Sequence, residues 1–527
     1  MNLILDYHER TKHHIYNLAR SLGFLDWKNQ PDPFRYYLDA EKIKLTFLAK
    51  EPDLKFRNLF IANKNTKEFD LENIGGFLEL SLGLSAWKSY LGNKWALRIN
   101  PSSGNLHPTE AHLILLVNDR GIYHYLPYNH TLEKRADIPN KTGLEILDEI
   151  NVPGFFVALT SIYWREAWKY GERAYRYCNH DLGHALAAIS IAANLFGWKV
   201  TYLSDIGDNE ISKILGFDKI NWIDSEEENP EILCYIHPPK YEFNKELSSG
   251  IINKLSVLDY KNKINQLSKD RINWDIIYRA ANFTKKPRTK PFCIKMEKSR
   301  VNDNEIELLA SKIIRQRRSA VDYNLEKSIM DKEVLLDILD KTIPRENIVP
   351  FDIKIIEPNI NLLLFIHNVK EIKQGLYFFL RNLEDKKNLQ NLSKEFIWKE
   401  VGSRLYILKE GSYRDIARMV SCNQDIASDS CFSLGMIANF KEIINKPYIY
   451  RNIHWESGLI GQVMYLCAEA HGFRATGIGC FFDDEVHKIL NLKNNNFRTV
   501  YHFTIGYPIE DRRLQTHEPY YHIEDKN

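Results

Sequence analysis

The sequence lacks the features that mark several common classes of protein. Its seven cysteines include no Cys-x-x-Cys pair, and an odd, scattered set is typical of a reducing compartment rather than of a secreted disulfide framework. No apolar run approaches the roughly 20 residues needed to cross a bilayer. The first ten residues also contain too few apolar side chains for a signal peptide. We therefore expect a cytoplasmic protein without a membrane anchor.

A strong net charge and a dinucleotide fingerprint are also absent. The 527 residues carry a formal net charge of +2, which gives no reason to expect nucleic acid or an anionic membrane as a partner. No Gly-x-Gly-x-x-Gly follows a predicted strand, which excludes a Rossmann site for tightly bound NAD. The chain does have 44% hydrophobic and 12% aromatic residues, enough for several large cores.

The composition along the chain predicts two globular halves joined by a polar connection. Residues 1–245 are expected to form a first domain, whose first 50 residues make a wrapping arm with one helix. Residues 246–299 are mostly polar and charged and are expected to connect the halves along the surface, partly as helix. Residues 300–527 are expected to form the second domain. In the first half, residue patterns predict a helix at 71–90, strands at 112–117, 121–126 and 155–162, and a buried helix at 181–196 that ends at Gly197.

The second half repeats features of the first at a single constant offset, which aligns Gly183 with Gly458. At this offset the following matches need no gap: Ala193 with Ala468, Gly197 with Gly472, Thr201 with Thr476, Asp208 with Asp483, Glu210 with Glu485, and Lys213-Ile-Leu215 with Lys488-Ile-Leu490. A colinear set that ends in an identical tripeptide indicates a duplicated domain. The period is the length of a domain, so the architecture is a tandem fusion and not a solenoid.

The segment from Arg98 to Glu110 contains the run Pro101-Ser-Ser-Gly-Asn105. Proline fixes φ and glycine frees it, so such a run is a shaped loop. The side chains of Ser102, Ser103 and Asn105 can meet a polar planar ligand from several directions. An ordinary turn before a strand explains the same residues, and both interpretations stay open at this point.

Together with other motifs, this run resembles the nitroreductase superfamily. In the first half the resemblance depends on Pro101-Ser-Ser-Gly-Asn105, Trp168-Lys-Tyr-Gly-Glu-Arg-Ala-Tyr-Arg176 and Asp181-x-Gly183-His184, which look like the azoline-forming (thiazole/oxazole) peptide dehydrogenase branch. In the second half it depends on Arg317-Arg-Ser-Ala320, Glu456-x-Gly458 with Gln462, Gly477-Ile-Gly-Cys-Phe481 and Gly506-Tyr-Pro508. The motifs are individually loose, but their order is specific.

The resemblance implies an α+β fold of two fused FMN-binding domains. Each would have a central, mostly antiparallel sheet flanked by helices, and the two would embrace as an intramolecular pseudo-dimer. The family binds FMN between its subunits, and NADH or NADPH visits as a transient electron donor. Here only the first half has the Pro-Ser-Ser run and only the second has the arginines and glycines, because Tyr202 and Ser204 occupy the positions of Gly477 and Gly479. One composite flavin site is therefore expected, and a further homodimer stays open.

The resemblance also assigns candidate cofactor-binding residues. The guanidinium groups of Arg315, Arg317 and Arg318 and the hydroxyl of Ser319 would hold the phosphate, and a solvated helix face is the alternative. Gly477, Ile478 and Gly479 would bring backbone N–H groups to the flavin ring. Two further arginines, Arg512 and Arg513, follow the last strand, where the family often places another phosphate-binding cation.

Lys169 and Tyr170 are the candidate catalytic pair. A Lys-Tyr pair in this setting is implicated in catalysis in the peptide-dehydrogenase branch, and such groups can remove or relay a proton. Simple packing at the interface is the alternative. His180 and His184 have a metal-ligand spacing but no evident third ligand, so no metal site is predicted. Cys480 lies within the glycine run, but the sequence names no base partner for it, so no nucleophilic role is predicted.

These features favour an FMN-dependent oxidoreductase that transfers hydride through flavin N5, with a small molecule or a peptide as substrate. A non-catalytic flavin-binding or scaffold subunit of a peptide-modification complex is the alternative. Dehalogenation, or other flavin chemistry on the same fold, is a third hypothesis.

Overall fold

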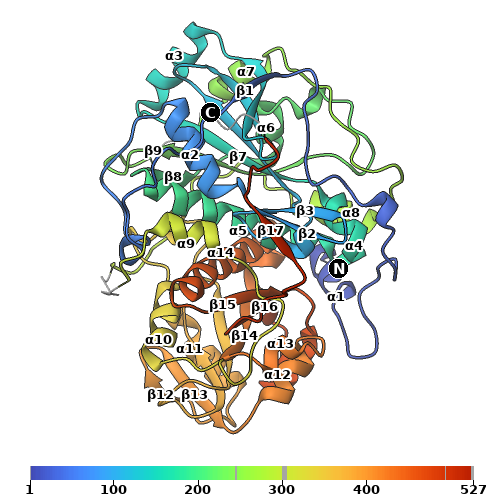
Figure 1. Cartoon of the computed structure of the whole chain (residues 1–527), viewed down its shortest axis with the longest axis vertical. Coiled ribbons are helices and arrows are strands. Elements are labelled where there is room, and N and C mark those ends of the chain that lie inside the picture. The colour runs from blue at the N-terminus through green and yellow to red at the C-terminus, as the bar shows by residue number, and fades with distance from the viewer. Residues whose placement is uncertain (1, 244–245, 300–305, 493, 524–527) are drawn as a thin grey trace.

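Each half of the chain forms one antiparallel seven-stranded sheet. The computed structural model describes residues 2–243, 246–299, 306–492 and 494–523. The first sheet has the order β1-β6-β5-β4-β7-β9-β8 and the second has the order β12-β13-β11-β10-β14-β16-β15, so six strands of each half correspond in order (Figure 1). The outermost strands differ, because β1 precedes the other strands of its sheet in sequence whereas β12 lies between β11 and β13. This correspondence confirms the predicted duplication and the α+β class.

The first sheet consists of β1 (Glu41–Lys44), β4 (Thr109–Leu115), β5 (Gly121–Leu126), β6 (Thr131–Asp137), β7 (Phe155–Ser161), β8 (Lys199–Tyr202) and β9 (Asn229–His237). The second consists of β10 (Ile360–Ile366), β11 (Gly375–Phe379), β12 (Lys399–Gly402), β13 (Leu405–Glu410), β14 (Phe432–Asn439), β15 (Arg474–Ile478) and β16 (Phe497–Gly506). Because the central strands are buried along their whole length, both faces of each sheet must be covered.

Helices cover both faces of each sheet. The outer face of the first sheet packs on α3 (Asn140–Ile150), α6 (Asp208–Ile214) and α7 (Ser249–Ser256), and that of the second on α11 (Lys386–Leu392), α12 (Arg414–Val420) and α15 (Asp483–Ile489). The inner faces share one continuous core with α2 (Leu71–Ser81), α5 (Ala174–Leu195) and α14 (Ile449–Ala470). The remaining helices are α1 (Leu3–Arg10), α4 (Tyr163–Tyr170), α8 (Asp275–Phe283), α9 (Ala310–Gln316), α10 (Lys332–Lys341) and α13 (Asp425–Ser428).

The two halves meet where α5 crosses α14, in the middle of the molecule (Figure 1). The crossing point is Gly183 against Gly458, the pair that the sequence repeat aligns. A Cβ atom on Gly183 would lie 2.3 Å from the carbonyl oxygen of Trp455, and one on Gly458 would lie 2.4 Å from that of His180. No side chain larger than hydrogen therefore fits at either position, which is the reason that both are glycine.

Two equivalent ion pairs flank this crossing. Arg176 of the first half pairs with Asp483 of the second at 2.7 Å, and Arg451 of the second half pairs with Asp208 of the first at 2.8 Å. The two arginines are separated in sequence by the same offset as Gly183 and Gly458, and so are the two aspartates. Each contact is thus made twice with the halves exchanged, which is the property of a twofold isologous interface.

Both ends of the described chain cross to the opposite half. At the N-terminal end, Lys12 pairs with Asp484 at 2.7 Å. At the C-terminal end, β17 (Gln515–His517) adds to the hairpin of β2 (Leu84–Tyr90) and β3 (Asn93–Arg98). Figure 1 shows the red C-terminal segment leaving the second half and running up along the first. The N-terminal segment thus contacts the second half, and it has a C-terminal counterpart that was not predicted.

The local predictions have mixed outcomes. Strand β5 has the predicted bounds and α5 ends before Gly197, whose φ is +66°. The predicted helix at 71–90 is wrong beyond Ser81, because the residues from Leu84 onward pair with β3 as a strand. Their alternation of apolar and small residues fits either structure, and long-range pairing decides between them. The domain limits at 245 and 300 stay a prediction.

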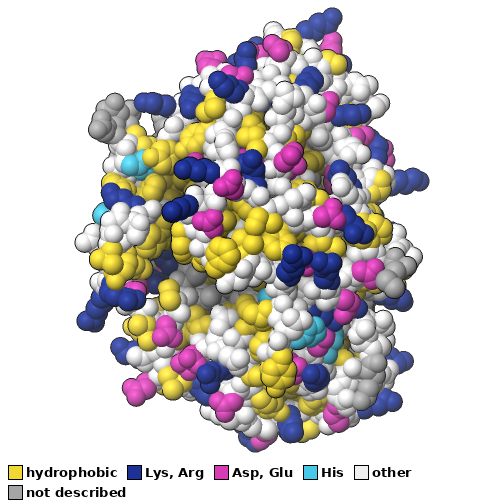
Figure 2. Space-filling model, turned by 90° about the vertical axis from the view of Figure 1, so that its right-hand side faces the viewer, with side chains coloured by type: hydrophobic (Ala, Val, Ile, Leu, Met, Phe, Trp, Pro, Cys, Tyr) yellow, Lys and Arg dark blue, Asp and Glu magenta, His cyan; other side chains and the backbone are white. Residues whose placement is uncertain are grey.

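No helix in the described part of the chain is both long and apolar enough to span a membrane. On the face drawn in Figure 2, hydrophobic side chains gather across the middle of the molecule, with Lys and Arg side chains above and below them.

The helix crossing generates a first prediction. Replacing Gly183 with alanine should lower the free energy of unfolding by about 1–3 kcal/mol, because the added methyl group forces the two central helices apart. Chemical denaturation followed by circular dichroism measures this change. Gly250→Ala is the matched control, since that glycine is exposed and a Cβ there would meet only the Ser248 hydroxyl at 3.3 Å. Equal effects of the two substitutions would contradict the close approach.

Candidate functional site

A cavity of about 530 Å³ lies between the two halves and is lined by residues from both. The first half contributes residues 100–105 with Tyr170, Tyr177 and Asp181. The second half contributes residues 317–319 and 476–480 with Tyr465 and Tyr501. This volume lies in the range of sites for small organic ligands. The predicted loop, two of the five predicted arginines and the glycine run therefore converge on one cavity.

The carboxylate of Asp181, on α5, holds the Pro101–Asn105 loop in shape. It accepts hydrogen bonds from the Ser102 hydroxyl at 2.7 Å, the Ser103 hydroxyl at 2.8 Å and the Ser103 N–H at 3.0 Å. Gly104, Asn105 and His107 all have φ between +52° and +60°, a conformation that non-glycine residues adopt only when their surroundings enforce it. The hydrogen bonds to Asp181 enforce this conformation, because they take the place of the backbone hydrogen bonds that a regular strand would make.

The polar side chains of this loop are therefore already engaged. Asn105 donates from its amide to the Ala96 carbonyl oxygen at 2.8 Å, and its own oxygen lies 2.9 Å from His107 Nε2. The hydroxyl protons of Ser102 and Ser103 point to Asp181. We expected all of these side chains to be free to contact a ligand, but their donors are already used within the protein. The hydroxyl oxygens of Ser102 and Ser103 can still accept hydrogen bonds.

Lys169 and Tyr170, at the end of α4, lie against Gly104. A Cβ atom on Gly104 would lie 2.7 Å from Tyr170 Oη and 3.1 Å from Lys169 Nζ, so the glycine is what lets both polar groups reach the loop. The Tyr170 ring packs 4.4 Å from that of Tyr177. Burial raises the pKa of Tyr170 well above its ordinary value, so its hydroxyl keeps its proton and can donate it in a hydrogen bond.

A buried acid pair lies beside these residues. The carboxyl of Glu166, one turn before Tyr170 on α4, lies near that of Asp181, and each shifts the pKa of the other. Burial raises the pKa of Asp181 to about 7 and raises the pKa of Glu166 further, with the charge of Asp181 adding to the effect. Two carboxyl groups in contact in a buried site cannot both be ionised, so they share a proton. Neither residue was predicted as part of the site, because only the fold brings α4 beside α5.

Two of the five predicted arginines line the cavity and three do not. Arg317 is buried and donates to the carbonyl oxygens of Arg98 and Ile99 at 3.3 and 3.1 Å, while its Nε has no partner among the described residues. Arg318 donates to the Ser85 carbonyl oxygen at 2.9 Å. Burial lowers the pKa of Arg318 to about 10, which leaves both guanidinium groups charged at neutral pH.

The remaining predicted cations lie elsewhere. Arg315 points to the opposite side of its segment and pairs with Glu51 and Glu79, both at 2.8 Å. Arg512 and Arg513 are exposed and do not line the cavity, and Arg513 pairs with Asp511 at 2.7 Å. Their assignment to phosphate binding has no support in this geometry. Three cations that were not predicted, Lys88, Arg98 and Arg474, do line the cavity.

The glycine run is shaped by tyrosines. Gly477 donates from its N–H to Tyr465 Oη at 3.0 Å, and the same hydroxyl lies 2.9 Å from that of Ser319. A Cβ atom on Gly477 would lie 2.0 Å from Tyr501 Oη, and one on Gly479 would lie 2.0 Å from the Tyr177 ring. The run therefore forms a wall of backbone and aromatic rings, in which Ile478 is the buried member.

The equivalent region on the other side of the molecule is filled by protein. Tyr202 and Ser204 stand at the positions of Gly477 and Gly479, and the connection between the halves packs onto them. Phe292 donates from its N–H to the Ser204 hydroxyl at 2.7 Å, and its ring lies 6.1 Å from that of Tyr202. The predicted connection is thus not a simple surface linker, because it occupies the place that corresponds to the cavity.

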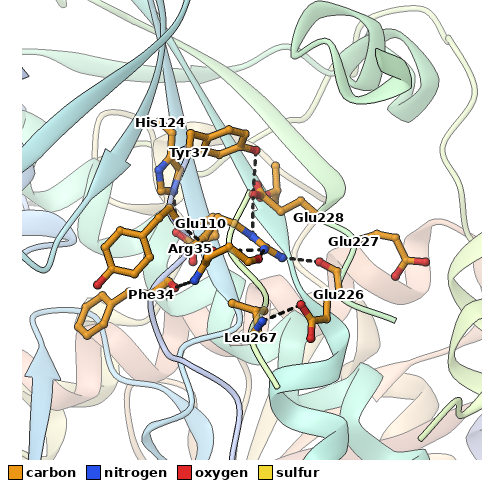
Figure 3. Close-up of polar contacts among 12 residues, drawn as sticks. Phe34, Arg35, Tyr37, Glu110, His124, Glu226, Glu227, Glu228 and Leu267 are labelled. Atoms are coloured by element: carbon orange, nitrogen blue, oxygen red, sulfur yellow. Dashed lines mark hydrogen bonds and ion pairs between the residues drawn. The ribbon is translucent and has the colours of Figure 1, made fainter. Parts of the chain in front are cut away.

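A network of buried charges supports the cavity from the first sheet (Figure 3). His124 of β5 lies 2.9 Å from both Glu110 and Glu133. Burial alone would lower the pKa of His124, but its hydrogen bonds to the two carboxylates raise that pKa to about 9. The imidazolium is therefore charged at neutral pH and neutralises part of the negative charge of its neighbours.

The same network fixes the N-terminal arm and the loop of the cavity. Figure 3 shows Arg35 of the arm beside Glu226, to whose carbonyl oxygen it donates at 2.5 Å. Arg165 of α4 donates hydrogen bonds to Glu110 at 2.5 Å and to the His107 carbonyl oxygen at 2.8 Å. Because His107 follows the Pro101–Asn105 loop, this ionic network is one of the supports that hold the loop in place.

His180 and His184 are buried on α5 and do not gather further ligands. The ring of His180 stacks on Tyr501 at 4.2 Å, and His184 lies 3.4 Å from both Gln462 and the Tyr501 hydroxyl. Among the residues that the structure describes, no group of three or more His, Cys, Asp or Glu side chains is arranged to hold a metal ion.

Comparison with known proteins gives matches in both halves. A family model described as the nitroreductase family matches residues 93–224 and 314–507, more than half of the chain. A Methanocaldococcus jannaschii protein that bears the name of a nitroreductase is 21% identical over 175 residues, which cover 31% of this chain and 85% of that protein.

Solved structures show the same fold. A crystal structure from Anabaena variabilis, also described as a nitroreductase, covers 97% of this chain and 100% of its own, with a TM-score of 0.70 at 20% identity. At this identity the likeness shows the fold alone. A chain of the Escherichia coli microcin synthetase McbBCD complex covers 45% of this chain and 92% of its own at 17% identity. Its TM-score of 0.26 is too low to support an argument.

The acid pair generates a second prediction. Between about pH 4 and pH 7 the native Asp181 carboxyl retains a proton that the unfolded chain, with an ordinary pKa of 3.8, has lost. The native state is therefore destabilised as the pH rises through this window. The wild type should have a higher free energy of unfolding than a Glu166→Gln, Asp181→Asn double variant at low pH, and this difference should shrink as the pH rises. Denaturant unfolding at several pH values measures it. Asp218→Asn, at an exposed position, is the control, and a difference independent of pH would contradict the shared proton.

Proposed function

The chain belongs to the nitroreductase family, and we propose that it is an FMN-dependent oxidoreductase with one composite flavin site between its two domains. The observation that carries this proposal is the cavity on which the Pro101–Asn105 loop, Tyr170, Arg317 with Arg318, and the Gly477–Gly479 run converge, with Lys169 behind its lining against Gly104. Each of these segments comes from a different part of the sequence, and their meeting in a cavity of ligand size is specific.

The residues around the cavity fit a flavin mononucleotide. Arg317 and Arg318 are buried or half-buried cations, and the buried Nε of Arg317 lacks a partner among the described residues, as expected for a group that awaits an anion. Aromatic rings and the backbone of the glycine run offer flat surfaces and donors for a ring system. A flavin bound there would supply a hydride acceptor and donor at N5.

A single cofactor per chain is supported by the asymmetry of the two sides. Where the first domain would offer its own glycine run, it has Tyr202 and Ser204, and Phe292 of the connection packs against both. The segment that corresponds to the Pro-Ser-Ser loop keeps one contact, in which Asn359 donates from its N–H to Glu456 at 3.1 Å. It lacks the two hydroxyl groups, so this side retains the architecture without the polar groups of a cofactor site.

Lys169 and Tyr170 are proposed to manage the proton of substrate oxidation. Removal of a hydride from a C–H or N–H centre requires a base that takes a proton in the same half-reaction. Lys169 Nζ and Tyr170 Oη both reach Gly104 at the edge of the cavity. The neighbouring Glu166 and Asp181 pair carries a proton that can compensate charge as Lys169 changes its protonation state. Tyr170, which keeps its proton, would orient the substrate as a hydrogen-bond donor.

The Lys-Tyr pair favours a peptide dehydrogenase of the azoline-forming type over a general nitroreductase, with NADH or NADPH or another acceptor serving the second half-reaction. A non-catalytic flavin-binding or scaffold subunit of a peptide-modification complex is the alternative. Turnover separates the two, because a scaffold would bind flavin without reducing it in the presence of NADPH, NADH or substrate.

The phosphate assignment generates a third prediction. The purified chain should release one FMN per polypeptide, and an Arg317→Ala, Arg318→Ala double variant should retain far less, because each charge-assisted contact is worth about 1.5–3 kcal/mol. Cofactor release followed by chromatography and protein quantitation gives the ratio. Arg315→Ala is the matched control, since it removes an arginine from the same segment but outside the cavity. Two flavins per chain, or full retention in the double variant, would overturn the assignment.

The proton assignment generates a fourth prediction. Lys169→Ala should leave flavin bound but slow substrate oxidation by about 100-fold or more, the typical loss when a general base is removed. Reduction by a nicotinamide should change far less, because it needs no such base. Stopped-flow absorbance follows the two half-reactions separately, after a screen of peptides, enones and nitroaromatics has supplied a substrate. Equal slowing of both would point to a displaced flavin, and no slowing would return the pair to a packing role.

A further inference from the structure

A cluster of two cysteines and a histidine lies at the edge of the cavity, where three distant segments meet. Cys480 lines the cavity as the residue after the glycine run. The loop that carries Cys422 is joined to it by two hydrogen bonds, from the Phe482 N–H to the Val420 carbonyl oxygen at 2.8 Å and from the Gln424 side chain to the Cys480 carbonyl oxygen at 3.2 Å. The two thiols are thereby brought close enough that each shifts the pKa of the other.

The N-terminal arm places His13 against the same thiols. The His13 N–H donates to the Asp483 carboxylate at 2.9 Å, and the Asp483 N–H donates to the His13 carbonyl oxygen at 3.2 Å. His13 Nδ1 accepts a hydrogen bond from the Ala19 N–H at 2.9 Å, so the ring proton is on Nε2. Burial lowers the pKa of His13, and the neutral ring therefore presents one donor, which its hydrogen bond to Cys480 uses.

The cluster shifts the pKa values of the two thiols in opposite directions. The hydrogen bond from Cys422 is the main reason that the pKa of Cys480 falls to about 5, and His13 and the charge of Arg173 add to it against the opposing effect of burial. The same hydrogen bond raises the pKa of Cys422. The other ionisable groups nearby are Tyr177 and Asp483, the second of which is paired with Arg173 at 2.9 Å. Cys480 is thus a thiolate at neutral pH and Cys422 a thiol, the complementary states of an attacking and a resolving cysteine.

The backbone of the Cys422 loop is also held in an uncommon conformation. Cys422 and Asn423 have φ of +55° and +59°, and two consecutive non-glycine residues in this region persist only when their surroundings enforce it. The remaining cysteines differ: Cys178, Cys234, Cys431 and Cys467 are buried, and Cys293 is exposed in the connection.

We propose that Cys480 and Cys422 form a redox-active dithiol that exchanges an electron pair with the cofactor of the cavity. The proposal rests on the flavin site proposed above. In the forward direction the thiolate and the thiol form one S–S bond and release two electrons and one proton, which are taken up by an oxidised flavin. The reverse direction opens the disulfide with the electrons of a reduced flavin. The chain could then pass electrons between its cofactor and an external thiol or disulfide.

The first arm of the test needs no flavin. The full chain is alkylated with iodoacetamide at pH 6 and pH 8, and the rate at each cysteine is measured by peptide mass spectrometry. Free glutathione, alkylated in parallel as the reference thiol, should react roughly 50- to 100-fold faster at pH 8 than at pH 6, whereas Cys480 should change by less than about twofold. Incubation with oxidised glutathione should yield a Cys422–Cys480 disulfide, and Cys422→Ser should instead leave glutathione attached to Cys480. An ordinary pH profile at Cys480, or no internal disulfide, would overturn the pair.

The second arm tests the exchange with the cofactor. Anaerobic titration of the oxidised, FMN-loaded chain with dithionite should consume four electrons per chain, of which bleaching of the flavin accounts for two. The Cys422→Ser and Cys480→Ser variants should each consume two electrons per chain. The control variant, Cys293→Ser, should consume four. A flavin-loaded wild type that consumes only two electrons would overturn the exchange even if the disulfide forms. A chain that forms the disulfide but binds no flavin would overturn the proposed cofactor site and, with it, the exchange.

Discussion

The close approach of Gly183 and Gly458 is the contact on which the rest of the architecture depends. Because neither residue has a side chain, α5 and α14 cross with their backbones nearly touching. This distance lets Arg176 reach Asp483 and Arg451 reach Asp208 across the same interface. It also brings Asp181 of α5, which holds the Pro101–Asn105 loop, within one turn of the crossing and so places that loop opposite the glycine run of the other domain.

Duplication made this symmetric framework, and the two sides of it have since diverged. The carboxylates of Asp181 and Glu456 occupy equivalent positions, and each accepts a backbone N–H from the loop it faces. Only the first of these loops has serines, and only the second domain has a glycine run beside it. The freed volume on the other side holds Phe292 of the connection, whose packing stabilises the fusion in place of a ligand. One side of the framework thereby encloses a cavity, and the other is packed by the chain itself.

The fold was largely predictable from the sequence, and the site only in part. The constant offset between the halves and the alternating apolar patterns are local or periodic signals, so they predicted the duplication and strands such as β5. The assignment of Arg315 to the cavity was misleading, since its side chain turns to Glu51 and Glu79 on another element. The proximity of Glu166 to Asp181, and of His13 to Cys480, relates residues that sequence spacing does not connect. Such groups become visible only when packing has placed α4, α5 and the N-terminal arm together.

The return of the C-terminal segment to the first half has a consequence for biosynthesis. Glu510, Asp511 and Leu514 line the cavity, and β17 follows them to pair with β2. A ribosome that has produced only the first domain has therefore produced one wall of a binding site that remains open to solvent. The second domain adds the opposite wall, but the rim closes only after β17, which follows both large sheets in the sequence, has joined a hairpin that was made early in the first domain. A polypeptide that stops short of β17 therefore has both walls of the cavity but an open rim.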